Sequence, residues 1–176
     1  MCLYYTPVSE HNQTNLFRLW DNFLSKGYYF MDILSKPSER LKDLMSEAEI
    51  KTPARAEKTN LEQSVISKFL RAERMPSAKS LVTLADYFHC STDYLLGLSD
   101  VLDEREYKQR PPFNEQLSFL LEHYNVTKYR LEKDTKLTEE TVNRWHKGKY
   151  EPTVESLVRL ATYFNCSVDF ILGRET

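Results

Sequence analysis

The sequence is poor in glycine, cysteine and net charge. Only 4 glycines occur among 176 residues, which disfavours a strand-rich fold with many tight turns and favours helices. The three cysteines, Cys2, Cys90 and Cys166, are far apart and form no CxxC pair, so neither a disulfide framework nor a zinc knuckle is indicated. Because the formal charge is −2, a nucleic-acid partner would have to be held by a local basic face.

Long hydrophobic runs are also missing. No apolar stretch reaches the roughly 18 residues that a transmembrane helix needs, and the start MCLYYTPVSEHNQ has no basic patch followed by an apolar run. We therefore expect no membrane association, and a reducing cytoplasm is the expected location. The 41% of hydrophobic residues are sufficient for at least one core.

One segment occurs twice, as YFHCSTDYLLG at 87–97 and as YFNCSVDFILG at 163–173. Three explanations compete: two copies of a reactive or metal-binding site, a covalent cross-link between the copies, or two copies of a domain. Pro76 and Pro152 set the offset at 152 − 76 = 76 residues, and apolar positions upstream match at that offset without a gap. Most surface residues differ, and this combination favours a duplicated domain. Matching pairs include Ser80/Ser156, Leu84/Leu160, Cys90/Cys166, Asp93/Asp169, Gly97/Gly173, Leu41/Leu117 and Phe69/Trp145.

The repeat divides the chain into four parts. We expect an N-terminal extension at 1–35, one domain at 36–97, a charged linker at 98–112 that ends in two prolines, and a second domain at 113–176. Residues 1–35 fit neither copy, because Gly27 and the aromatic residues after it interrupt an apolar-faced segment. They are either an upstream extension, with a start at Met31, or a helix docked on the first domain.

Helical periodicity dominates each copy, so we predict an all-α fold with five short helices per copy. Helix-start signals and a glycine stop divide the first copy into its elements. Leu41, Leu44, Met45 and Ala48 lie on one face of an expected helix. The helix-start and break signals are Thr52 before Pro53, a break at Thr59 and Asn60, and Pro76 and Ser77 before the next helix. We expect a helix over 63–70 and a short helix from Ser91 to Leu96 that Gly97 stops.

Two helices joined by a tight turn, in AEKTNLEQSVISKF (56–69), are followed by RAERMPS and LVTLADYFHCSTDYLLG. This segment resembles the lambda-repressor-like helix-turn-helix family, also called the Cro/repressor or XRE type. The second copy resembles it as well, in TKLTEETVNRWHKGKYEP and SLVRLATYFNCSVDFILG. The resemblance covers about 120 of the 176 residues. It implies two tandem five-helix domains whose second motif helix lies in the major groove.

In the first copy the resemblance implies base contacts from the helix over 63–70 and backbone contacts beside it. Glutamine can bond adenine and lysine can donate to guanine, whereas backbone contacts set register without reading sequence. The base-facing candidates are Gln63, Ser64, Ser67 and Lys68, and the backbone candidates are Thr52, Arg71 and Arg74. Arg55 and Ala72 depart from the family pattern, in which leucine and glycine are usual at those positions.

The second copy departs further. Its candidates are Thr138, Asn143 and Arg144 for bases and Lys128, Lys147 and Lys149 for phosphates. Glu139 and Glu140 put carboxylates where the DNA polyanion would meet the helix. Glu132 replaces the small residue that is usual in the family where the two helices approach closely. We interpret the first two as N-terminal acids favoured by the helix dipole rather than as readers of cytosine. The second copy should therefore bind DNA more weakly or more narrowly.

No motif supports an enzyme, a cofactor or a metal. Cys90 and Cys166 are expected in the core, because cysteine is often buried. Asp93 and Asp169 follow Ser91 and Ser167 in the first turn of a short helix, where hydroxyl capping and the helix dipole explain them. None of the four histidines falls in a ligand-like spacing.

The resulting hypothesis is a sequence-specific transcriptional regulator of bacterial, phage or mobile-element type. Its partner is double-stranded DNA, with one half-site for each domain. The alternative is that one copy binds DNA and the second mediates homodimerisation or binds a protein such as a toxin or an antirepressor. The near-neutral charge of both copies leaves this alternative open.

Overall fold

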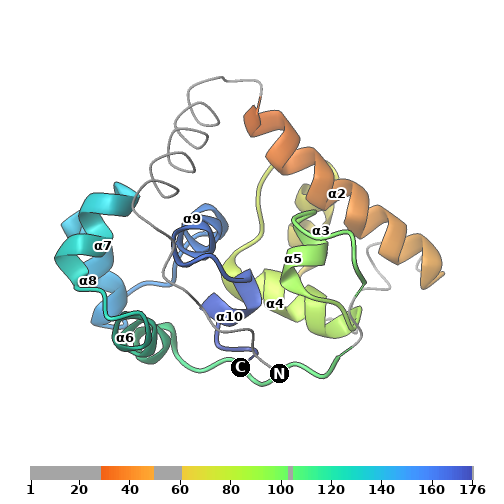
Figure 1. Cartoon of the computed structure of the whole chain (residues 1–176). Coiled ribbons are helices and arrows are strands. Elements are labelled where there is room, and N and C mark those ends of the chain that lie inside the picture. Colours follow the sequence, from red (N-terminus) through yellow and green to blue (C-terminus); the bar gives the residue numbers. More distant parts are fainter. Residues whose placement is uncertain (1–28, 50–60, 103–104, 176) are drawn as a thin grey trace. The chain divides into compact units, whose positions relative to one another are not determined.

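The computed structural model describes residues 29–49, 61–102 and 105–175 (Figure 1). Within these ranges the fold is all-α, with nine helices and no strand. The chain divides into two compact units, 1–33 and 34–176, and both copies of the repeat belong to the second. None of the helices in the described ranges is both long and apolar enough to cross a bilayer.

The described part of the first copy has four helices, α2 (Tyr29–Glu47), α3 (Gln63–Leu70), α4 (Ala78–Tyr87) and α5 (Thr92–Leu95). The expected hydroxyl caps are confirmed: Ser77 accepts from the backbone N–H of Ser80 at 3.1 Å, and Ser91 from that of Tyr94 at 2.9 Å. Gly97 follows α5 with φ +70°, the left-handed conformation that glycine adopts without strain. Thr52, Arg55, Thr59 and Asn60 lie outside the described residues.

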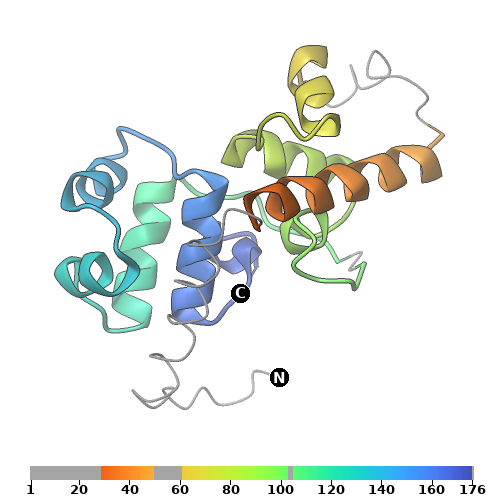
Figure 2. The same cartoon turned by 90° about the horizontal axis from the view of Figure 1, so that it is seen from above.

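All five expected helices are present in the second copy: α6 (Phe113–His123), α7 (Lys128–Thr135), α8 (Glu139–His146), α9 (Val154–Phe164) and α10 (Val168–Ile171) (Figure 2). Hydroxyl side chains cap four of them at the N-terminus, namely those of Thr127, Thr138, Thr153 and Ser167. Packing of α6 on α8 and of α9 on α10 encloses the core of this copy.

The repeat seen in the sequence is also a repeat of structure. Helices α3 and α8 have the same bounds after the 76-residue shift (139 − 63 and 146 − 70), and so do α5 and α10 (168 − 92 and 171 − 95). Left-handed residues recur at the same offset, in the pairs Glu49/Asn125, Ala72/Gly148, His89/Asn165 and Gly97/Gly173. Helices α2, α3 and α5 therefore end at points equivalent to the ends of α6, α8 and α10, and α9 is one residue longer than α4.

The first helix differs from the prediction at both ends. Helix α2 begins at Tyr29, where the aromatic residues after Gly27 were expected to interrupt the helix. It continues through Pro37, whose equivalent in the second copy, Phe113, is the first residue of α6 (113 − 37 = 76). Proline suits a first turn because its missing N–H is not needed there. At the other end Ala48 is exposed and follows the last helical residue, so it is not a core position.

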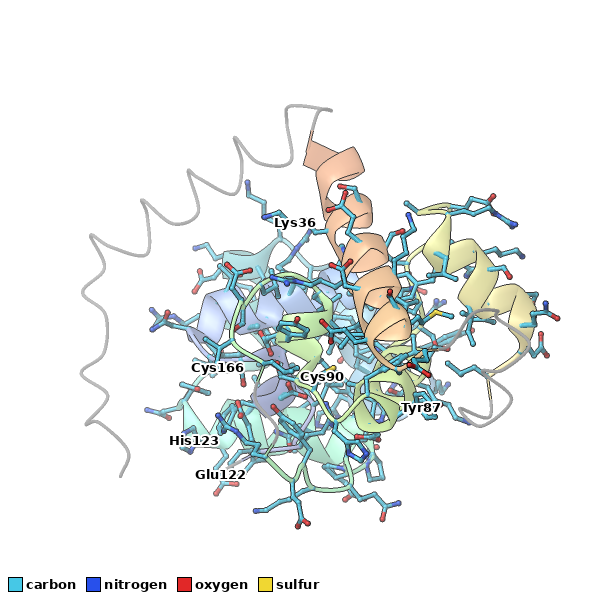
Figure 3. All side chains as sticks on the ribbon, turned by 90° about the vertical axis from the view of Figure 1, so that its right-hand side faces the viewer. Lys36, Tyr87, Cys90, Glu122, His123 and Cys166 are labelled. Carbon is cyan, nitrogen blue, oxygen red and sulfur yellow. The ribbon has the colours of Figure 1, made fainter. Side chains whose placement is uncertain are left out.

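Equivalent apolar residues form the core of each copy. Leu41, Phe69 and Leu81 are at most 1% exposed, and so are their counterparts Leu117 and Leu157, with Trp145 at 3%. Cys90 is buried as predicted, and Cys166 is partly buried (Figure 3). Burial raises the pKa of both thiols to about 12, so both remain protonated and act as apolar groups.

Candidate DNA interface

Helix α3 presents a polar face opposite two buried anchors. Ile66 and Phe69 are each 1% exposed and hold the helix to the core of the first copy. Three of the four predicted base-facing residues, Gln63, Ser64 and Lys68, are exposed, and Ser67 is partly exposed. The helix thus offers an amide, two hydroxyls and an ammonium group on its outer side, which are donors and acceptors suited to base edges.

Of the two arginines after α3, one already has a partner. Arg71 Nε lies 2.6 Å from Glu73 Oε1, and its terminal nitrogen lies 3.1 Å from the other carboxylate oxygen. This hydrogen bonding lowers the pKa of Glu73 and raises that of Arg71. A phosphate would therefore compete with Glu73 for Arg71, whereas Arg74 is exposed beside them.

Helix α8 is anchored in the same way by Val142 and Trp145, but its outer face pairs internally. Arg144 lies 2.5 Å from Glu140 and stands over the ring of Tyr150, with its guanidinium carbon 5.0 Å from the ring centroid. Asn143 donates to Glu139 Oε1 at 3.5 Å. Two of the three residues predicted to contact bases in the second copy, Asn143 and Arg144, are thus in contact with carboxylates of their own helix.

This pairing extends the interpretation of the two glutamates. They do lie in the first turn of α8, as the helix dipole favours, but each also engages a residue one turn later. The four-residue spacings of Glu139 to Asn143 and of Glu140 to Arg144 are the signal that could have predicted it. Such exposed pairs are weak, so the side chains are restrained rather than locked.

The remaining candidates of the second copy flank α8. Thr138 caps the helix by accepting from the backbone N–H of Thr141 at 3.2 Å, so its hydroxyl has a structural role. Lys147 is the C-cap residue of α8 and is exposed, as is Lys149. Lys128 and Glu132, both on α7, are partly buried. The three lysines remain predicted phosphate contacts.

Sequence reasoning missed a contact between the copies, where α5 packs against α10 (Figure 1). Asp93, on α5, accepts from the backbone N–H of Val168 at 2.9 Å and from that of Asp169 at 3.3 Å. Asp169, on α10, accepts from the backbone N–H of Thr92 at 2.8 Å. Each aspartate therefore binds the N-terminus of the other copy's short helix, in addition to the serine cap that each helix has.

Arg174 adds a charged link at this contact. Its side chain is fully buried and pairs with Asp169 of its own copy and with Asp86 on α4 of the first copy. The ring of Tyr107 lies against it, 4.4 Å from the guanidinium carbon. A buried arginine is tolerated only when it is paired, and here two carboxylates and a π face surround it.

The segment between the copies, predicted as a charged linker, also makes contacts with the second copy. The backbone N–H of Lys108 donates to the carbonyl of Arg174 at 2.8 Å. Two ion pairs hold it on either side, Arg105 with Glu175 at 3.2 Å and Arg110 with Glu151 at 2.7 Å. Residues 105–110 are thus attached to the second copy at several points.

Burial changes the electrostatics of the two aspartates. It raises the pKa of Asp93 to about 6, partly opposed by the N–H donors of Val168 and Asp169. Burial raises the pKa of Asp169 too, and Arg174 opposes this rise. Because their oxygens are bound to backbone N–H groups across the contact, both residues have a structural role.

Together, two helices with buried anchors and exposed polar faces, α3 and α8, the second of them following α7, are typical of a DNA-binding protein of the helix-turn-helix class. Family models agree: one described as a Cro/C1-type HTH DNA-binding domain matches residues 116–176, and one described as helix-turn-helix matches residues 56–95. The chain therefore contains two helix-turn-helix domains of the Cro/C1, or XRE, family, which confirms the predicted resemblance. Searches of curated proteins and of solved structures found no match.

Proposed function

We propose that this DNA-binding regulator is a sequence-specific transcriptional regulator of bacterial, phage or mobile-element type, with α3 and α8 as its recognition helices. The observation that carries the proposal is the pair of Cro/C1-type domains, with an exposed polar face on α3 in one and on α8 in the other. In such domains that helix enters the major groove with its N-terminal residues near base edges.

The first copy is the stronger reader in this proposal. Gln63 is suited to adenine and Lys68 to guanine, and both are exposed on α3. Arg74 and, in competition with Glu73, Arg71 supply phosphate contacts that set the register.

The second copy contributes mainly through the phosphate backbone. Lys147 and Lys149 are exposed at the end of α8, and Lys128 begins α7. Asn143 and Arg144 must first leave Glu139 and Glu140 before they contact bases. DNA binding by this copy is accordingly weaker.

In a second candidate function, the second copy makes protein contacts, either with another copy of this chain or with a different protein. The exposed carboxylates of Glu139 and Glu140 favour it, because they repel phosphates and suit a basic protein surface. On this reading only α3 contacts DNA.

A salt titration of DNA binding with the full chain distinguishes the two candidate functions of the second copy. The slope of log affinity against log salt changes by about 0.9 for each phosphate contact. We expect the double variant Lys147→Ala/Lys149→Ala to have a slope shallower by about 1 to 2 than the wild type. Lys133→Ala, an exposed lysine on α7, is the control.

Two results would oppose the proposal. An unchanged slope in the double variant supports the protein-contact role of the second copy. If the full chain prefers no DNA sequence over any other, the regulator function itself is wrong.

A further inference from the structure

The contact between the copies is reciprocal. Asp93 binds the N-terminus of α10, and Asp169, its counterpart at 93 + 76, binds the N-terminus of α5. The acceptor positions match as well, because Thr92 and Val168 are equivalent (168 − 92 = 76). When one element meets its own equivalent and each contact is returned, the two copies are related by an approximate two-fold axis. A head-to-tail arrangement, which a tandem repeat also allows, would pair different surfaces.

The contact is well buried on both sides. Thr92 and Leu95 of α5 and Val168 and Ile171 of α10 are all fully buried. The two-fold relation therefore joins the copies through their last helices, and the buried residues of both copies form one continuous cluster.

One feature breaks this symmetry. Arg174 is fully buried against Asp86 and Asp169, whereas the equivalent residue of the first copy, Leu98 (174 − 76), is 53% exposed. The counterpart of Asp86 is Thr162, which has no charge. Arg174 therefore adds two ion pairs to the two symmetric caps, one across the contact with Asp86 and one within its own copy with Asp169.

The two recognition helices differ at every predicted base-facing position. The pairs are Gln63/Glu139, Ser64/Glu140, Ser67/Asn143 and Lys68/Arg144, whereas the anchors below them stay apolar. The scaffold is thus two-fold and the reading surface is not.

We propose that the chain binds DNA as a single-chain pseudo-dimer, on an operator whose two half-sites are inverted relative to each other but different in base sequence. The proposal rests on the proposed function. Two-fold related recognition helices match the local two-fold axes of B-DNA, with half-sites about one turn, or roughly 34 to 36 Å, apart. Because α3 and α8 carry different side chains, the protein binds this site in one orientation, which an identical pair of domains cannot do.

Selection of bound sites from a random DNA pool by the full chain tests the arrangement directly. The expected consensus has two unequal half-sites in inverted orientation at one fixed spacing. Identical half-sites, a direct repeat or a single half-site would overturn the inference and leave the regulator function standing. A pool without enrichment would instead contradict the proposed function.

Two variants test the assignment of each helix to its half-site. Lys68→Ala should relax base preference in one half-site only, and Arg144→Ala in the other only. If both variants relax the same half-site, or each relaxes both, the single orientation is refuted. Lys79→Ala, on the outer face of α4, is the control and should leave the consensus unchanged.

The reciprocal caps are tested by the double variant Asp93→Ala/Asp169→Ala, read out on operators lengthened by about five base pairs, half a helical turn. We expect the wild type to lose about tenfold or more in affinity on the lengthened operator, and the double variant to lose clearly less, because its domains no longer hold one relative orientation. Asp93→Asn retains a carbonyl acceptor and should discriminate spacing like the wild type; Asp169 is left unchanged in this control because it also pairs with the buried Arg174. Asp43→Ala, an exposed aspartate on α2, controls for the loss of a carboxylate.

Retention of full spacing discrimination by the alanine pair would overturn the inference. Circular dichroism verifies that its helix content is intact. If it is not, the single variants Asp93→Ala and Asp169→Ala each provide the same readout, with partial loss of discrimination expected and full retention contradicting the inference.

Discussion

The recognition helices α3 and α8 have equivalent bounds and equivalent anchors, yet they use charge in opposite ways. On α3 the exposed lysine follows a glutamine and two serines, whereas on α8 two glutamates pair with an asparagine and an arginine of the same helix. By contrast, α5 and α10 retain both the aspartate and the serine that cap them. The duplicated domain has thus kept what holds it together and changed what it presents to DNA.

The largest expected effect tests the part that the copies share. Leu81→Ala and Leu157→Ala remove fully buried, equivalent side chains, and each should lower the free energy of unfolding by about 2 to 5 kcal/mol. Urea denaturation measures this, with the equivalent exposed residues in Lys79→Ala and Glu155→Ala as controls. An unchanged midpoint in either leucine variant would show that this copy does not depend on its core as described.

The next effect concerns the two reading surfaces. Lys68→Ala should weaken specific DNA binding by about 1 to 3 kcal/mol, and Arg144→Ala by less, because Glu140 and Tyr150 already restrain Arg144. Fluorescence anisotropy at one salt concentration gives both values. Equal losses would remove the proposed difference between the copies.

A smaller effect concerns the contact between the copies and its pH dependence. The pKa of Asp93 is raised from 3.8 to about 6, so the folded state favours the protonated carboxyl. The stabilisation that results is fully present below about pH 4 and is lost as the pH rises through 6. Asp169 and Arg174 face the same contact, and Asp169 adds to the rise. We therefore expect the free energy of unfolding of Asp93→Asn, relative to that of the wild type, to rise by about 1 to 2 kcal/mol between pH 4 and pH 7.

Urea denaturation at both pH values provides the measurement, with Asp43→Asn as the exposed control. A difference between wild type and Asp93→Asn that does not vary with pH would contradict the raised pKa.

The smallest effect sharpens the account of α8. Glu140→Gln removes a carboxylate from the reading face and releases Arg144, so it should raise DNA affinity by a few-fold, or less than about 1 kcal/mol. Glu155→Gln changes the same charge in the first turn of α9 and serves as the control. Unchanged or weaker binding by Glu140→Gln would mean that Glu140 does not restrain the second reader.

Much of the fold follows from local sequence signals. The serines at 77, 91 and 167 cap helices where expected, because a hydroxyl one residue before an apolar repeat satisfies backbone N–H groups within the same turn. The start of α2 was not predicted, because Gly27 and the aromatic residues after it indicated an interruption. The helix instead begins at Tyr29 and continues through Pro37.

The candidate site could be predicted only as far as its interactions are local. Exposure of Gln63 and Lys68 follows from helical periodicity with Ile66 and Phe69 inside. The roles of Asp93 and Asp169 were incompletely predicted, because a helix-dipole explanation already accounted for them. Asp86, the partner of Arg174 in the first copy, lies 88 residues away in sequence, and no spacing rule connects such positions.

The reciprocal contact of α5 with α10 has a further consequence for how the protein behaves on dilution. A homodimer dissociates as its concentration falls, so its occupancy of an operator depends on assembly as well as on binding. Here both partners of the contact are one polypeptide, and their association is independent of how many molecules a cell contains. A few molecules would retain the paired state, and occupancy would rise in simple proportion to protein at low concentration, without the threshold that dimer assembly imposes.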